Sequence, residues 1–165
     1  MFTVRDYQKK DIPLRVKWFN NEKINQFLSN ENQGKTNLEK QTDWFKRYSR
    51  DISKKFFTFE YDKKPIGFMG FSNINFTNKN ADIFIMIGED EYLGKGLGET
   101  AMKRLIEYGF GELELHKICL GVFDENTRAL NLYKKLGFEI EGTLVDDAFF
   151  DGKYHDTLIM SIFNR

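Results

Sequence analysis

The sequence contains few prolines, cysteines or histidines, the residues typical of rigid linkers, disulfides and metal sites. Its 165 residues include 2 prolines, 1 cysteine and 2 histidines. So few prolines leave no Pro-rich linker, and one cysteine can form neither an internal disulfide nor a cysteine-based metal site. We therefore expect a single domain spanning residues 1–165, with no metal.

Net charge and long apolar stretches are missing as well. The 25 Lys and Arg residues balance the 25 Asp and Glu residues, which argues against nucleic acid as the main partner. No apolar run approaches the roughly 18 residues of a membrane span, and Met1–Asp6 contains no apolar leader. These patterns predict a cytoplasmic protein with no membrane partner.

Aromatic residues are plentiful, and strand-like and helix-like periodicities alternate along the chain. We expect strands at 56–61, 66–75, 82–87, 117–122, 138–144 and 155–163. We expect helices at four places: after Asp11, behind a capping box at 36–39, from a glycine-rich turn at 93–98 to about 110, and at 126–136. This order predicts an α/β (α+β) fold, a mixed and largely antiparallel central sheet flanked by helices. Apolar residues on both parities of 83–87 predict a central strand.

A glycine turn, Leu93-Gly94-Lys95-Gly96-Leu97-Gly98, lies between the expected strand 82–87 and the following helix. Glycines let backbone N–H groups converge on a phosphate, and a helix N-terminus adds unpaired donors and partial positive charge. Lys95 contributes further positive charge. The turn alone therefore predicts a phosphate site.

Two other interpretations of the turn stay open at this point. It could merely start a helix, for which one or two glycines would suffice. Residues 96–101 also fit the G-x-G-x-x-A form of the dinucleotide fingerprint, although residues 88–95 separate them from the strand that should precede them directly.

A second cluster about thirty residues later, Asn126 to Phe138, narrows these choices. The turn and this cluster together resemble the GNAT superfamily of acetyl-CoA-dependent N-acetyltransferases, from about Phe56 to the end of the chain. The family's Gln/Arg-x-x-Gly-x-Gly/Ala pattern corresponds to residues 93–98. Its later motif is matched by Asn126, Tyr133, Lys135, Gly137 and Phe138. The resemblance implies a GNAT-like fold and acetyl-CoA as co-substrate.

The resemblance also implies a role for individual residues. Ile85, Met86 and Ile87 should face the pantetheine and the acetyl carbonyl, where an exposed N–H would stabilise an oxyanion. The turn should hold the pyrophosphate, with Leu93 departing from the family's Gln or Arg. Asn126 is the expected pantetheine contact, Lys135 a phosphate contact, Tyr133 the general acid and Asp82 the base.

Each of these side chains also has a simpler interpretation. Asn126 could be a helix N-cap, Tyr133 a core aromatic residue, and Asp82 an ordinary charge near a strand start. Cys119 has no evident activating partner in the sequence, so we expect direct transfer rather than an acetyl-cysteine intermediate.

The acceptor site of this family is built by the opening helices and the last strands. Those regions carry Trp18, Phe19, Phe27, Trp44 and Phe45, then Asp146, Asp147, Phe149, Phe150, Asp151, Tyr154 and Asp156. The tail looks most like the branch of ribosomal-protein, spermidine and nucleotide-amino-sugar acetyltransferases. We expect transfer to a primary amine of a small molecule such as an amino sugar.

A protein N-terminus or a polyamine are the alternative acceptors. A non-catalytic acetyl-CoA-binding module is the alternative of another class, made conceivable by Leu93 and opposed by the presence of Asn126 and Tyr133. A homodimer is left open.

Overall fold

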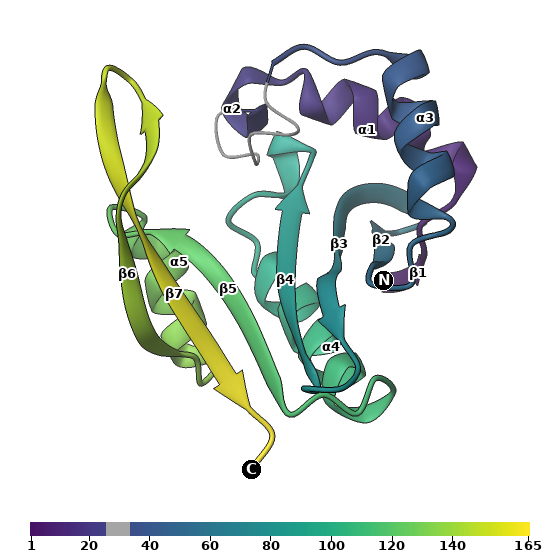
Figure 1. Cartoon of the computed structure of the whole chain (residues 1–165). Helices are drawn as coiled ribbons and strands as arrows, with labels where there is room; N and C mark the ends of the chain where they lie inside the picture. Colours follow the sequence, from purple (N-terminus) through teal and green to yellow (C-terminus); the bar gives the residue numbers. More distant parts are fainter. Residues whose placement is uncertain (26–33) are drawn as a thin grey trace. The chain divides into compact units, whose positions relative to one another are not determined.

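A computed structural model describes residues 1–25 and 34–165 (Figure 1). The strands are β1 (Phe2–Asp6), β2 (Lys55–Tyr61), β3 (Lys64–Asn75), β4 (Asn80–Ile87), β5 (Lys117–Phe123), β6 (Glu139–Phe150) and β7 (Lys153–Phe163). The helices are α1 (Ile12–Phe19), α2 (Glu22–Asn25), α3 (Leu38–Tyr48), α4 (Leu97–Gly111) and α5 (Thr127–Lys135), with 3-10 turns η1 (Lys9–Asp11) and η3 (Asp90–Tyr92).

The strands form one seven-stranded sheet in the order β1-β2-β3-β4-β5-β7-β6. Strands β4 and β5 pair in parallel, with Asn80 opposite Lys117, whereas the β1–β2, β5–β7 and β6–β7 pairs are antiparallel. The mixed, mostly antiparallel sheet flanked by helices is confirmed, as is the central place of β4.

The described residues divide into two compact units. One comprises Met1–Gly70 and Ile85–Gly98, and the other comprises Phe71–Phe84 and Glu99–Arg165. Strands β3 and β4 each contribute residues to both units. The single domain expected from chain length stays a prediction.

Aromatic side chains form the core of the first unit. The Trp18 and Tyr7 rings pack on Phe68 of β3 at centroid distances of 4.6 and 5.0 Å, and Tyr7 meets Trp44 of α3 edge-on at 5.8 Å. The guanidinium of buried Arg15 lies 3.5 Å from the Trp44 ring centroid. These contacts hold α1 and α3 against the strands of this unit.

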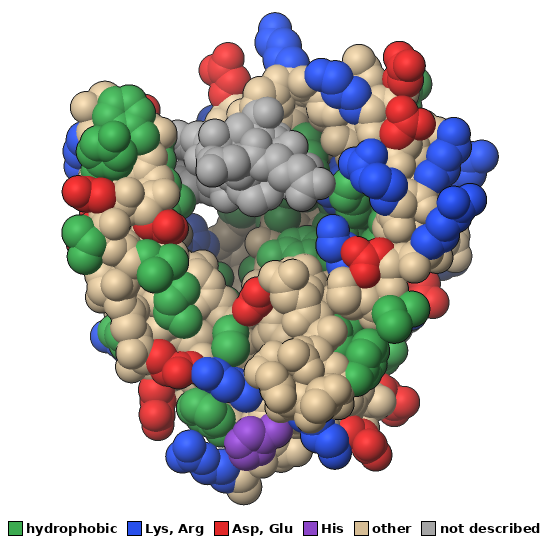
Figure 2. Space-filling view, in the orientation of Figure 1, with side chains coloured by type: hydrophobic (Ala, Val, Ile, Leu, Met, Phe, Trp, Pro, Cys, Tyr) green, Lys and Arg blue, Asp and Glu red, His purple; other side chains and the backbone are tan. Residues whose placement is uncertain are grey.

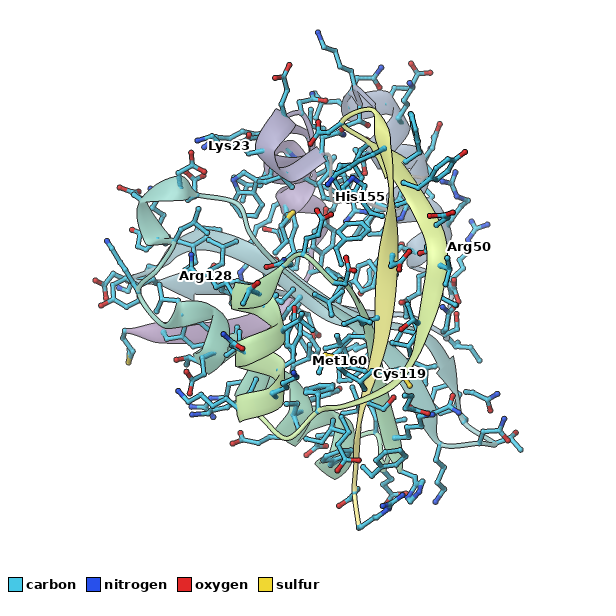
Figure 3. All side chains as sticks on the ribbon, turned by 90° about the vertical axis from the view of Figure 1, so that its left-hand side faces the viewer. Lys23, Arg50, Cys119, Arg128, His155 and Met160 are labelled. Atoms are coloured by element: carbon cyan, nitrogen blue, oxygen red, sulfur yellow. The ribbon has the colours of Figure 1, made fainter. Side chains whose placement is uncertain are left out.

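In the second unit, α4 and α5 pack on the strands. A methyl group at Gly109 of α4 would lie 2.8 Å from Ile118 of β5 and 3.0 Å from Phe71, so only glycine allows this close approach. Helix α5 lies against the β5-β7-β6 strands, and Figure 3 shows it beside them with Arg128 on the helix and Met160 on β7. Gly137, at φ +100°, ends the helix next to Ile162 of β7.

The last hairpin is longer than expected from the sequence. Strand β6 continues to Phe150 and β7 begins at Lys153, joined by Asp151 and Gly152 in left-handed conformations. A register shift between Leu144 and Ala148 breaks the alternation of side chains, so the sequence pattern does not predict a strand across this stretch. Apolar side chains lie exposed along this hairpin (Figure 2), including Leu144, Val145, Phe149 and Tyr154. The homodimer stays a prediction.

One expected cap is also different. Asn37, rather than Thr36, caps α3 by accepting a 2.9 Å hydrogen bond from the Lys40 N–H. The Thr36 hydroxyl instead accepts from the Gln41 side chain at 2.8 Å. Either residue type can cap a helix, and the local chain path selects the second of the two.

Residues 1–25 and 34–165 contain neither a helix suited to spanning a membrane nor a cluster of metal ligands. None of the helices there has the length and apolar character needed to cross a membrane. No grouping of three or more His, Cys, Asp or Glu side chains suited to a metal ion occurs in that part of the chain.

Candidate functional site

The glycine turn is built by backbone conformation. Gly94 and Gly96 have φ values of +74° and +76°, which other L-residues adopt only at a cost. Leu93 before them is extended, and its side chain is 49% exposed. Among the described residues, apart from Gly96 itself and its two chain neighbours, no atom lies within 4 Å of where a Gly96 Cβ would be, which leaves room for a ligand on that side.

The loop that leads from β4 to this turn forms several ion pairs with other residues of the first unit. Glu89 pairs with Lys17 at 2.6 Å, Asp90 with Lys23 at 3.1 Å and Glu91 with Lys64. The ammonium groups of Lys64 and Lys95 each lie 5.3 Å from the centroid of the Tyr92 ring. The turn is thus held at several points before the α4 helix begins.

The end of β4 lies just before this loop. Ile85, Met86 and Ile87 are half-buried, and the Gly88 N–H donates to the Ile66 carbonyl of β3 at 2.8 Å. A methyl group at Gly88 would lie 2.0 Å from the Trp18 indole, so Trp18 packs directly on this backbone. Partial exposure fits the expectation that this segment faces a ligand.

In the second unit, the expected contact residues of α5 already have protein partners. Asn126 is the N-cap, and its side-chain oxygen accepts from the Ala129 N–H at 3.2 Å. Lys135 forms a 2.8 Å ion pair with Glu99 in the first turn of α4, and Glu99 also pairs with Lys103. Hydrogen bonds from Lys103 and Lys135 lower the pKa of Glu99 to about 2.

Tyr133 is half-buried on α5, and its ring meets Phe138 edge-on at 5.9 Å. Burial raises the pKa of Tyr133 above its ordinary value, so the phenol is protonated at neutral pH. Within the described part of the chain, no group hydrogen-bonds to its hydroxyl. The group therefore has a proton to donate and no acceptor for it among the described residues.

Asp82 and Cys119 lie opposite each other on β4 and β5 of the second unit. The Asp82 carboxylate accepts a 2.8 Å hydrogen bond from the Asn73 side chain, a contact that no sequence pattern predicts. The Ser161 hydroxyl donates to the Cys119 sulfur at 3.4 Å, and Lys117 also interacts electrostatically with Cys119.

The expected residues are distributed between the two units. Residues 85–87 and 93–98 belong to the first, whereas Asp82, Asn126, Tyr133 and Lys135 belong to the second. Among the expected acceptor aromatics, Trp18, Phe19 and Trp44 are buried core residues, Phe45 is half-buried, and Phe27 lies outside the described residues.

Sequence reasoning also missed two carboxylates. Glu89 and Glu99 flank the glycine turn, and each binds two donors. Their only signal in the sequence is their position beside the turn.

A family model described as an acetyltransferase (GNAT) domain matches residues 2–139. The chain belongs to the GNAT acetyltransferase family. The resemblance expected from the two motifs is therefore confirmed. Acetyl-CoA is the acetyl donor used by this family.

Two curated relatives indicate the branch. The spermidine N(1)-acetyltransferase of Escherichia coli K12 is 37% identical over 124 residues, 75% of this chain and 66% of that protein. The acetyltransferase PseH of Campylobacter jejuni is 30% identical over 135 residues, covering 82% of this chain and 81% of that protein. The chain thus matches slightly less than two thirds of the Escherichia coli enzyme's length.

A solved structure extends the match to nearly the whole chain. Spermidine N-acetyltransferase from Vibrio cholerae, in complex with CoA and spermine, superposes with a TM-score of 0.90 and 30% identity. The match covers 98% of this chain and 95% of that one. Family and fold therefore agree.

Proposed function

We propose that this protein transfers an acetyl group from acetyl-CoA directly to a primary amine of a polyamine. The observation that carries the proposal is the exposed turn with two left-handed glycines at the start of α4, in a chain of the GNAT family. Relatives named as spermidine acetyltransferases support a polyamine acceptor better than the amino sugar expected from the sequence.

Backbone N–H groups of residues 93–98 would bind the pyrophosphate, aided by the α4 N-terminus and by Lys95. Asn126 uses its side-chain oxygen as a cap, which leaves its amide N–H₂ to donate to pantetheine. Lys135 would reach a phosphate only by leaving Glu99, so its contribution to affinity is reduced by that ion pair.

The reaction requires a neutral amine nucleophile. An alkyl amine titrates near 10.4, so at pH 7 about one molecule in 2,500 is neutral, a cost of about 4.6 kcal/mol. Asp82 is our candidate base, although its carboxylate must then act while accepting from Asn73. Attack of the amine on the thioester carbonyl gives a tetrahedral oxyanion, which a backbone N–H among residues 85–87 would stabilise.

Collapse of that intermediate breaks the C–S bond and releases the CoA thiolate, to which Tyr133 would donate a proton. Because burial raises the pKa of Tyr133, it is protonated throughout the neutral range but is a weaker acid than a thiol near 8.5. Tyr133 should therefore assist departure of the thiolate rather than control the rate.

A panel of amines tests the proposal. Thiol release from acetyl-CoA would be measured with spermidine, an amino sugar and a peptide with a free N-terminus, alongside calorimetric titration with acetyl-CoA and with NAD. We expect acetyl-CoA binding and fastest turnover with spermidine. Acetyl-CoA binding with no turnover on any amine would instead indicate a binding module, and NAD binding alone would contradict the cofactor assignment.

A further inference from the structure

One carboxylate at the end of β4 is held in an unusual way. Glu89 follows Gly88, and its side chain is only 16% exposed. A single oxygen, Oε1, accepts from both the Trp18 indole N–H at 2.9 Å and the Lys17 ammonium at 2.6 Å. The other oxygen, Oε2, has no donor within the described part of the chain.

Trp18 makes this carboxylate rigid. Its side chain is 1% exposed, lies on the Gly88 backbone and packs against Phe68 at 4.6 Å. Since the indole is buried and packed on both Gly88 and Phe68, its N–H holds Oε1 in place and orients the second oxygen. A fixed carboxylate loses little side-chain entropy when it binds a cation, unlike a mobile one at the surface.

Glu89 also carries its charge at neutral pH. Burial opposes ionisation, but the hydrogen bonds from Lys17 and Trp18 outweigh it, so the pKa of this carboxyl lies below its ordinary value. Glu89 is therefore a poor base for an amine and a good anchor for an ammonium ion.

Lys17 shows which chemical group this carboxylate accepts. Its side chain is 62% exposed and presents a primary alkylammonium, the same group that ends a polyamine. An exposed lysine contributes little to stability through such a pair and can swing away. A ligand ammonium could then replace it on Oε1 or bind beside it on Oε2.

We propose that Glu89 binds a second, non-reacting ammonium of the acceptor and so selects amines that carry more than one positive charge. The inference rests on the proposed function. Glu89 lies two residues beyond Ile87, roughly 7 Å along an extended chain. An ammonium held there would be separated from the reacting nitrogen by a few carbon atoms, as in an alkyl polyamine.

Glu89→Gln is the decisive variant, because glutamine keeps an oxygen for the Trp18 N–H but loses the charge. We expect KM for spermidine to rise about tenfold, with kcat within twofold. The acetyl-CoA Kd and KM for butylamine, which has no second charge, should stay unchanged. Asp90→Asn, which removes the neighbouring exposed carboxylate, is the matched control and should leave every value unchanged.

Lys17→Met separates binding from a merely structural clamp. If Lys17 competes with the substrate ammonium, its removal should lower KM for spermidine two- to threefold, the opposite direction to Glu89→Gln. If the pair only fastens α1 to the loop, both variants should lower the melting temperature and leave KM unchanged. That result would overturn the inference.

Calorimetric titration with spermidine alone keeps this test apart from the proposed function. If the native protein acetylates amines but Glu89→Gln retains its spermidine Kd and KM, the Glu89 inference fails and the function stands. If it binds spermidine through Glu89 yet acetylates no amine, the proposed function fails and the binding role of Glu89 stands.

Discussion

The glycine turn and helix α5 carry the two family motifs in physically different ways. In the turn, the proposed phosphate binding would depend on backbone conformation, since Gly94 and Gly96 have positive φ values. At α5, the proposed cofactor contacts would depend on side chains that already have protein partners, since Asn126 caps the helix and Lys135 pairs with Glu99. The first motif therefore depends on backbone conformation, and the second depends on side chains that also have protein partners.

The largest expected effect tests the side-chain motif. Tyr133→Phe should lower kcat ten- to a hundredfold, with little change in acetyl-CoA affinity, because it removes only the proton donor. Since burial raises the pKa of Tyr133 above its ordinary value, the phenol stays protonated from pH 7 to 9, and the ratio of native to variant kcat should be constant over that range.

Steady-state kinetics at a pH where chemistry limits the rate provides the measurement. Tyr108→Phe, a half-buried tyrosine on α4, is the matched control for loss of a hydroxyl. An unchanged kcat for Tyr133→Phe would contradict the role as general acid and would leave Tyr133 as a packing residue of the helix.

The next effect tests the backbone motif. The methyl group of Gly96→Ala would meet no non-neighbouring atom of the described residues, but the alanine must adopt φ near +76°, which costs about 1–2 kcal/mol. We expect the acetyl-CoA Kd to rise about tenfold by calorimetry. Gly111→Ala adds a methyl group in equally open space at an ordinary φ and should leave Kd unchanged. Equal Kd values for the two variants would show that the turn does not hold the cofactor.

The smallest expected effect comes from adding a side-chain contact to the backbone turn, at Leu93. Leu93 is the exposed residue that stands where the family has Gln or Arg. Leu93→Arg would add a charged donor beside the turn and should lower the acetyl-CoA Kd three- to tenfold, more at low salt. Leu38→Arg changes a similarly exposed leucine on α3 and controls for net charge. An equal decrease in the acetyl-CoA Kd for both variants would show that the added charge acts only at long range.

Much of the fold could be predicted because local signals were strong. Runs rich in apolar and aromatic residues located the strands from β2 to β5, and the glycine turn located the start of α4. The last hairpin was predicted too short because the irregularity after Leu144 interrupts its alternation. The expected capping box shifted by one residue because Ser, Thr, Asn and Asp share nearly the same capping chemistry.

The sequence by itself determined the family and allowed the conformation of the turn, because glycine at positions 94 and 96 accepts a positive φ without steric cost. Only the tertiary structure decided which charged groups are already paired. Glu89 meets Trp18 and Lys17 across about seventy residues of chain, and Lys135 meets Glu99 across 36. Such contacts depend on how the chain folds back on itself, and no local pattern encodes them.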